Sequence, residues 1–158
     1  MDIPHTVITK SAQETAGVGQ KLGRELSRGG THTGCVQDSH PVCAVCLYGE
    51  LGSGKTTFVQ GFAKGLGITS RLLSPTFIIV RRYQIPQSQG FLYHLDLYRV
   101  EESDLEEFAI SDILSDLNSF VVVEWAEKLG VWMPKKRLDI KFSVLSDGNH
   151  EINYHQSH

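Results

Sequence analysis

One eight-residue segment restricts the fold of this chain more than any other. Residues 49–56 read Gly-Glu-Leu-Gly-Ser-Gly-Lys-Thr and satisfy GxxxxGK[ST] at every required position. The motif indicates a phosphate-binding loop when a strand precedes it and a helix follows it. Residues 43–48 form an apolar run that is typical of a buried strand. The residues from 55 to about 66 are typical of a helix, which we expect to end at Gly65 and Gly67.

Each residue type in this loop has a physical role. Glycines let the backbone curl so that successive N–H groups point into an anion-binding nest, and the following helix adds the positive end of its dipole. We expect Lys55 to reach the β- and γ-phosphates, the Thr56 hydroxyl to ligate Mg²⁺, and Thr57 to donate to the α-phosphate. The loop residues expected to contact a nucleotide are Gly49, Gly52, Ser53, Gly54, Lys55, Thr56 and Thr57.

Two carboxylates are candidates for a second acidic site, because a carboxylate that ends a neighbouring strand commonly holds Mg²⁺ in such proteins. Glu124 follows the apolar run 120–123, and Asp96 lies in the β-rich run 91–97. An unpaired charge next to the core is costly, so a cation would explain either position. The alternatives are a solvated strand end for Glu124 and an ion pair with Arg99 for Asp96.

The remaining segments predict a single α/β domain over residues 1–158, P-loop NTPase-like, with a mixed sheet flanked by helices. Ser11 and Glu14 form a capping box. The segments expected are a strand at 4–9, a helix at 12–26, a surface loop at 31–41, a hairpin of 77–83 and 91–97, an acidic helix at 101–110 capped by Ser103 or its neighbours, a central strand at 120–123, and closing strands at 138–145 and 151–154.

The charge balance of 15 basic and 18 acidic residues gives a net charge of −3, which argues against a broad basic face for nucleic acid. No run approaches the ~18 apolar residues of a membrane span. Residues 1–5 lack the features of a secretion signal. We therefore expect a cytoplasmic protein with no membrane contact.

The three cysteines cannot form a closed disulfide framework. A zinc site from His32, Cys35, His40 and Cys43 is conceivable, but these spacings match no common zinc pattern. Residues three apart on a strand face opposite sides, so Cys43 and Cys46 would not converge on one ion. We expect Cys46 to be a small core residue.

Four segments together resemble one family. They are Gly49–Thr57 (GELGSGKTT), Ser74–Phe77 (SPTF), His94–Arg99 (HLDLYR) and Glu124-Trp125 (EW). Their order and approximate spacing are similar to those of the bacterial tRNA threonylcarbamoyladenosine biosynthesis ATPase family, TsaE, formerly called YjeE. The resemblance covers most of the chain.

The resemblance implies a cytoplasmic, Mg²⁺-dependent ATPase that binds ATP and ADP. It further implies that the chain assists formation of N6-threonylcarbamoyladenosine at position 37 of tRNAs that read ANN codons. The implied partners are the TsaD and TsaB subunits, of which TsaD is the transferase. With a net charge of −3, we expect no strong direct binding of tRNA by this chain alone.

Carried over position by position, Lys55, Thr56 and Thr57 match the nucleotide and Mg²⁺ residues of the family. By the same resemblance, Glu124 matches its Mg²⁺-associated glutamate and Asp96 its hydrolysis-critical aspartate. In the same way, Thr76 matches its switch threonine and Trp125 its tryptophan beside the nucleotide. From the residues alone, Trp125 is equally compatible with a core or rim position, and 74–76 is an ordinary turn that could present the Thr76 hydroxyl to the γ-phosphate.

The chain also departs from the family pattern. Glu50 and Ser53 stand where Asp and Ala are commoner, the loop at 31–41 is long, and residues 148–150 read Gly-Asn-His where the family often has Gly-Arg.

Two other functions remain open from the sequence. A small-molecule or nucleotide kinase could use the same loop, although no Arg-bearing lid is evident. A nucleotide-gated interaction switch could use slow hydrolysis only to reset binding. If the chain is an ATPase, we expect slow turnover alone and faster turnover when TsaD and TsaB dock near Ser74–Phe77 and His94–Arg99.

Overall fold

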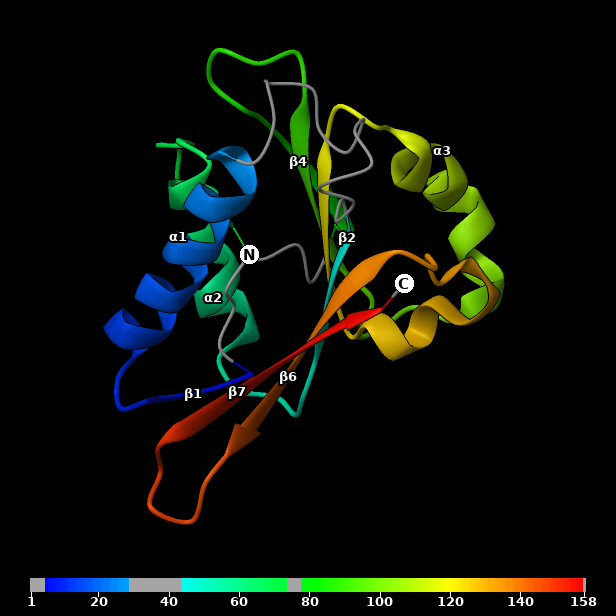
Figure 1. Cartoon of the computed structure of the whole chain (residues 1–158). Coiled ribbons are helices and arrows are strands. Elements are labelled where there is room, and N and C mark those ends of the chain that lie inside the picture. Colours follow the sequence, from blue (N-terminus) through cyan, green and yellow to red (C-terminus); the bar gives the residue numbers. More distant parts are fainter. Residues whose placement is uncertain (1–4, 29–43, 74–77, 158) are drawn as a thin grey trace.

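The computed structural model describes residues 5–28, 44–73 and 78–157. Along the chain (Figure 1), its elements are β1 (Thr6–Thr9), α1 (Ala12–Arg28), β2 (Ala44–Tyr48), α2 (Lys55–Gly65), β3 (Val80–Gln84), β4 (Phe91–Asp96), the 3₁₀ helix η1 (Glu102–Phe108), α3 (Ile110–Ser115), β5 (Phe120–Glu124), the 3₁₀ helix η2 (Ala126–Trp132), β6 (Arg137–Val144) and β7 (His150–Ser157).

The seven strands form one mixed sheet in the order β1-β7-β6-β2-β5-β4-β3. Its four central strands, β6, β2, β5 and β4, are parallel to one another, and β7, β1 and β3 join antiparallel toward the edges. Strands buried on both faces are typically continuous apolar runs, and β2 and β5 follow this rule. The predicted α/β fold with a mixed sheet flanked by helices is confirmed.

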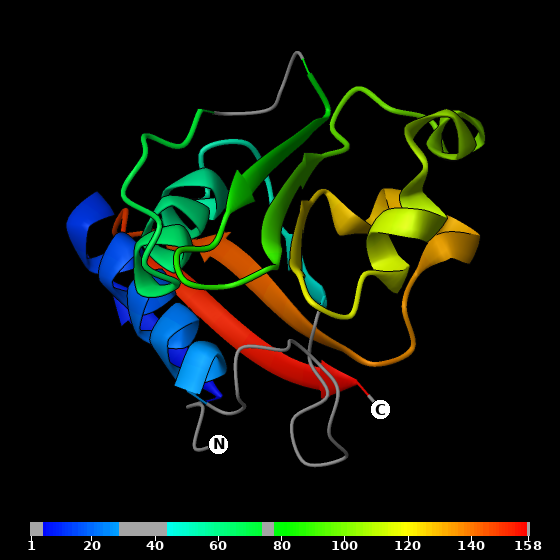
Figure 2. The same cartoon turned by 90° about the horizontal axis from the view of Figure 1, so that it is seen from above.

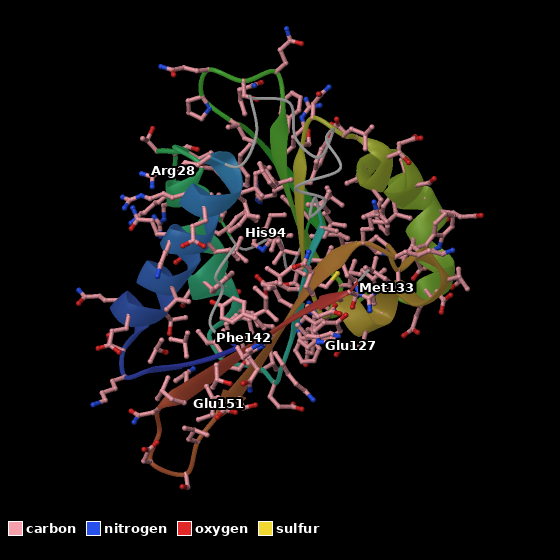
Figure 3. All side chains as sticks on the ribbon, in the orientation of Figure 1. Arg28, His94, Glu127, Met133, Phe142 and Glu151 are labelled. Carbon is pink, nitrogen blue, oxygen red and sulfur yellow. The ribbon has the colours of Figure 1, made fainter. Side chains whose placement is uncertain are left out.

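Helices cover both faces of the sheet (Figures 1 and 2). α1 and α2 lie on one face, where Phe58 and Phe62 of α2 pack on Val122 and Ile140 of the strands. Phe142, labelled in Figure 3, meets Phe58 edge to face with ring centroids 5.4 Å apart. η1, α3 and η2 cover the opposite face, where the buried apolar side chains include Leu95, Leu97, Leu105, Ile110, Val123 and Leu129.

Four glycines let α1 lie directly against α2. A Cβ added at Gly61 would come 1.8 Å from the carbonyl oxygen of Ala16, and one at Gly19 would come 2.1 Å from that of Phe58. Gly23 and Gly65 are equally close to backbone atoms of the other helix. This contact brings the first turn of α1 beside the beginning of α2, where the phosphate loop ends.

Most predicted elements are confirmed. The strand and helix around the glycine-rich loop, the hairpin of β3 and β4, and the closing strands β6 and β7 are all present. The Ser11 cap is present too, because the Glu14 N–H donates to the Ser11 Oγ at 3.1 Å. Cys46 is fully buried, as expected.

The prediction of one acidic helix over 101–110 is wrong. Ala109 takes a left-handed backbone conformation, with φ of 50°, and separates the 3₁₀ helix η1 from α3. The cap is at Glu101, whose N–H donates to the Asp104 carboxylate, and not at Ser103. η2 was not predicted, and β3 begins at Val80.

Several predictions lie outside the described residues. They are the loop at 31–41, the conceivable zinc ligands His32, Cys35, His40 and Cys43, and the switch residue Thr76. In the described part of the chain, no helix is both long and apolar enough to cross a membrane.

Candidate functional site

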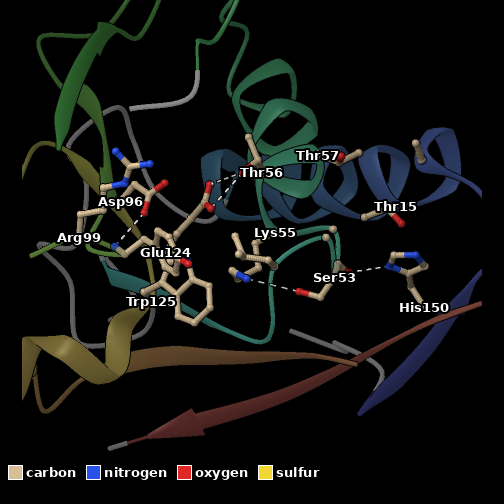
Figure 4. Close-up of a pocket in the computed structure, with 15 residues that line it drawn as sticks. Thr15, Ser53, Lys55, Thr56, Thr57, Asp96, Arg99, Glu124, Trp125 and His150 are labelled. Atoms are coloured by element: carbon tan, nitrogen blue, oxygen red, sulfur yellow. Dashed lines mark hydrogen bonds between the residues drawn. The ribbon is translucent and has the colours of Figure 1, made fainter. Parts of the chain in front are cut away.

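A cavity of about 640 Å³ lies over the glycine-rich loop at the carboxyl ends of the parallel strands. Its walls come from the first turn of α1, the loop and the beginning of α2, the ends of β4 and β5, and the start of β7 (Figure 4). In open parallel sheets, ligands bind at this edge. The expected site residues that line the cavity are Gly52, Ser53, Gly54, Lys55, Thr56, Thr57, Asp96, Glu124 and Trp125.

The pairing of β4 with β5 places two carboxylates side by side. Asp96 and Glu124 are the last residues of these parallel strands and are partners in the register. Side chains alternate between the two faces of a strand, so Asp96, Glu124 and also His94 face the side that α2 covers. Asp96 is 6% exposed and Glu124 is 3% exposed. The sequence predicts both carboxylates as candidates, and the strand pairing makes them neighbours.

Glu124 is held by two side chains. The Thr56 Oγ1 lies 3.0 Å from each carboxylate oxygen, and the His94 Nε2 lies 2.8 Å from Oε1. His94 is fully buried, and its Nδ1 has no hydrogen-bond partner among the residues that the structure describes. His94 lies in the HLDLYR segment, where no role was predicted for it. His94 and Asp96 are two residues apart on one strand and so share a face, and this spacing is the signal that could have identified His94.

The pair of Thr56 and Glu124 fits a magnesium ion. Octahedral Mg²⁺ binds oxygens at about 2.1 Å, which puts adjacent ligands about 3.0 Å apart. The Thr56 hydroxyl and the Glu124 carboxylate have this separation. Within the described residues, no group of three or more His, Cys, Asp or Glu side chains could hold a metal ion. Magnesium in proteins commonly keeps water and substrate phosphate oxygens among its ligands.

Asp96 has a fixed orientation at the same end of the cavity. Its Oδ1 accepts the backbone N–H of Tyr98 at 3.0 Å. Arg99, which follows in the chain, lies beside it in Figure 4 and lines the cavity as well. The loop after β4 therefore contributes both an acidic and a basic side chain to this end of the site.

Lys55 bends back over the loop that it follows. Its Nζ donates to the carbonyl oxygens of Gly49 at 2.5 Å and Glu50 at 2.9 Å. Burial lowers the pKa of the Lys55 ammonium, and the carboxylates of Glu124 and Asp96 act against this lowering. The ammonium is therefore held against the carbonyl oxygens of its own loop, and a phosphate group that enters the cavity would take the place of these contacts.

The Trp125 side chain forms one wall beside this lysine. The Lys55 Nζ lies 4.4 Å from a ring centroid of the indole, within the range of a cation–π contact. The ring of Tyr98 packs against the indole with centroids 4.9 Å apart. Trp125 has a φ of 58°, a left-handed conformation that is rare for a bulky residue and that occurs mainly at functional sites.

Among the described residues, one expected site residue is not part of the cavity wall. Gly49 lies behind the loop, where a Cβ would come 2.6 Å from the carbonyl oxygen of Phe142. Its role in the structure is the close approach to β6 and the contact of its carbonyl with Lys55. Thr76 lies outside the described residues.

Three residues of the cavity that lie outside the glycine-rich loop and the 94–99 segment were not anticipated. Ala12 and Thr15 come from the first turn of α1, and His150 comes from the start of β7. They are far from the glycine-rich loop in the sequence, and no local pattern marks them. The strand order and the contact between α1 and α2 bring them to the loop.

The chain is similar to a group of known proteins. Residues 9–152 match the family model for "Threonylcarbamoyl adenosine biosynthesis protein TsaE". The tRNA threonylcarbamoyladenosine biosynthesis protein TsaE of Treponema pallidum (strain Nichols) is 35% identical over 147 residues, which are 92% of this chain and 96% of that protein. The protein of the same name from Bacillus subtilis (strain 168) is 38% identical over 116 residues, covering 72% of this chain and 70% of that protein.

A solved structure has the same fold. The crystal structure of Bacillus subtilis YdiB superposes with a TM-score of 0.67 at 28% sequence identity, over 96% of this chain and 84% of that one.

Proposed function

This chain belongs to the TsaE family, and from that premise we propose that it is a magnesium-dependent ATPase that supports N6-threonylcarbamoyladenosine formation in tRNA. The relatives are named for threonylcarbamoyladenosine biosynthesis in tRNA, which supports this modification as the process in which the chain acts. Nucleotide binding follows from the family, and the glycine-rich loop agrees with it.

The observation that carries the proposal is the position of Thr56 and Glu124. A hydroxyl from the loop and a carboxylate from the next parallel strand lie 3.0 Å apart, directly beside Lys55. These two residues would hold Mg²⁺. When bound, the ion would neutralise charge that develops on the phosphate oxygens. Lys55 would bind the β- and γ-phosphates, and the backbone N–H groups of the loop would surround the phosphate chain.

We assign Asp96 to the attacking water. Phosphoryl transfer is catalysed largely by positioning and electrostatic stabilisation, and one group must orient the nucleophile. The carboxylate of Asp96 is oriented by the Tyr98 N–H and lies beside Glu124 at the end of the cavity. A carboxylate in this place would accept a hydrogen bond from water while Glu124 serves the metal.

We propose that the TsaD–TsaB pair completes the site. Two large apolar side chains, Leu51 and Tyr98, line the cavity and are 66% and 37% exposed. Exposed apolar side chains at the mouth of a site favour a protein partner. A partner docked there, near residues 94–99, would exclude water and add contacts to the phosphates. Turnover by the isolated chain should therefore be slow.

The test is a reconstitution. ATP hydrolysis and the yield of threonylcarbamoyl-tRNA are measured with this chain alone, with the TsaD–TsaB pair alone, and with all three. We expect a slow rate for the chain alone and a faster rate with the pair. We also expect sustained tRNA modification only with all three, and a Lys55→Ala chain should fail to support it. The proposal would be refuted if the pair does not change the ATPase rate and tRNA modification continues over many turnovers without this chain.

A further inference from the structure

His150, the first residue of β7, contacts the glycine-rich loop at the opposite end of the cavity from Asp96 (Figure 4). Its Nδ1 lies 2.6 Å from the carbonyl oxygen of Ser53. A carbonyl oxygen only accepts hydrogen bonds, so Nδ1 carries the hydrogen and donates it. This contact joins residues that are 97 positions apart in the sequence.

The contact determines how one peptide group of the loop is turned. No peptide bond in the described residues is cis. In a trans peptide the C=O and the N–H point in opposite directions. Since the Ser53 carbonyl is turned outward to β7, the Gly54 N–H of the same peptide is turned inward, to the side of the loop that faces the cavity.

The backbone of Gly54 is suited to this arrangement. Its φ of 105° and ψ of 7° are left-handed, and the helical residue Lys55 follows. Alternation of left- and right-handed residues makes consecutive N–H groups converge on an anion. A Cβ at Gly54 would come 3.3 Å from both the His150 Nδ1 and the Thr15 methyl group. His150 and Thr15 therefore enclose the position that a side chain would occupy at this glycine.

His150 is itself held in place by both neighbouring strands. It is the register partner of Thr9 in β1 and of Val144 in β6. The Thr9 hydroxyl lies 2.7 Å from that of Thr15, which joins β1 to the first turn of α1 beside the loop. The imidazole therefore projects from a strand that is paired on both sides and not from a loop.

We propose that His150 is a positioning residue for the nucleotide phosphates. By holding the Ser53 carbonyl outward, it keeps the Gly54 N–H directed at the phosphate chain and so increases affinity for nucleoside di- and triphosphates. The inference rests on the proposed function, since it requires nucleotide in this cavity. It deepens that function by assigning part of the affinity to a residue outside the glycine-rich motif.

The test uses the full chain and ADP with Mg²⁺ as the probe. Calorimetry gives the affinity, and the NMR amide signal of Gly54 reports the phosphate at that N–H. His150→Ala and His150→Leu should bind ADP about tenfold more weakly, as expected for the loss of one orienting hydrogen bond. The change in the Gly54 amide shift on adding ADP should shrink in both. His150→Asn keeps an N–H at the position of Nδ1 and should bind within about threefold of wild type.

His155→Ala is the matched control, because this histidine lies exposed on the same strand. It should bind ADP as wild type does. Thermal unfolding without nucleotide identifies any variant that fails to fold, and the Leu and Asn variants then provide the comparison. The inference is overturned if the Ala and Leu variants bind ADP as tightly as wild type and show the same change in the Gly54 amide shift. It is also overturned if the Leu and Asn variants lose the same amount of ADP affinity. A wild-type chain that binds no ADP would instead refute the proposed function and this inference with it.

Discussion

The His94 Nε2 lies 2.8 Å from the Glu124 Oε1, and neither side chain is more than 3% exposed. A buried carboxylate is costly unless it is hydrogen-bonded. Here an imidazole from β4 and a hydroxyl from α2 share it. Glu124 therefore has a defined position at the end of β5, which a flexible surface carboxylate would not have.

Replacing Glu124 by Gln tests its assignment to the metal. Gln keeps the shape and can still bond to His94 and Thr56, but it removes the charge that Mg²⁺ requires. We expect the Mg²⁺ concentration for half-maximal ATP hydrolysis to rise at least about tenfold, while ADP affinity without Mg²⁺ stays within about twofold. The measurement is a magnesium titration of the ATPase rate. Glu107→Gln, at an exposed carboxylate in η1, should leave the titration unchanged. An unaltered titration in Glu124→Gln would contradict the metal role.

Replacing Asp96 by Asn tests its assignment to the attacking water. Asn keeps an oxygen that can accept the Tyr98 N–H, so the turn after β4 should persist. We expect kcat to fall by about 100-fold or more while ATP affinity changes little, the pattern of an interaction made mainly in the transition state. Steady-state kinetics and calorimetry measure the two quantities, with exposed Asp112→Asn as the control. An equal loss of affinity would make Asp96 a metal ligand or a structural residue.

The Lys55 ammonium should give nucleotide binding a distinctive dependence on pH. Its charge attracts phosphate below its pKa and is lost as the pH rises through that pKa. Burial lowers the pKa of Lys55 from the ordinary lysine value of 10.5, so ADP affinity should begin to fall at a lower pH than an exposed lysine would give. Calorimetry from pH 7 upward measures this. Lys55→Met should bind ADP weakly, remain folded by circular dichroism, and lack the alkaline decline. A decline of the same size in Lys55→Met would assign it to another group.

The contact between α1 and α2 leads to a prediction about stability. Gly61→Ala would place a methyl group 1.8 Å from the Ala16 carbonyl oxygen, so the helices must move apart. We expect a loss of about 1–3 kcal/mol in the free energy of unfolding, which is the usual cost of overpacking. Gly17→Ala is the control on the same pair of helices, because its Cβ would meet nothing within 4 Å. It should stabilise the chain by up to about 1 kcal/mol. Urea unfolding of both variants gives the comparison, and similar effects would contradict the tight contact.

The buried thiol of Cys46 should be unreactive in the folded chain. Burial, together with the nearby Asp139 carboxylate, raises the pKa of Cys46 to about 12. At pH 8 only about one thiol in ten thousand would then be the reactive thiolate. In a Cys35→Ser, Cys43→Ser chain, a thiol reagent should label no cysteine under native conditions and one cysteine in urea. Rapid labelling of the native chain would show that Cys46 is accessible.

Much of the site could be predicted because its signals are local. The glycine-rich loop, the strand before it and the helix after it follow from residue spacing and from the backbone freedom of glycine within about 25 consecutive residues. The same holds for the Ser11 cap and for Glu124 at the end of an apolar run. The error at 101–110 has a local cause, since acidic composition indicates a helix but does not reveal that Ala109 turns left-handed and divides it.

Only the tertiary structure decided which of these residues meet. The sequence by itself determined that Glu124 ends an apolar strand and that Asp96 lies in another strand, but the parallel pairing of β4 with β5 makes them neighbours. Likewise, His94 meets Glu124 across 30 positions, and His150 meets Ser53 across 97. Such contacts depend on strand order, which is selected by the packing of whole faces against α1 and α2 on one side and α3 on the other. The free energy of this packing is a sum over the entire core, so no short stretch of sequence determines it.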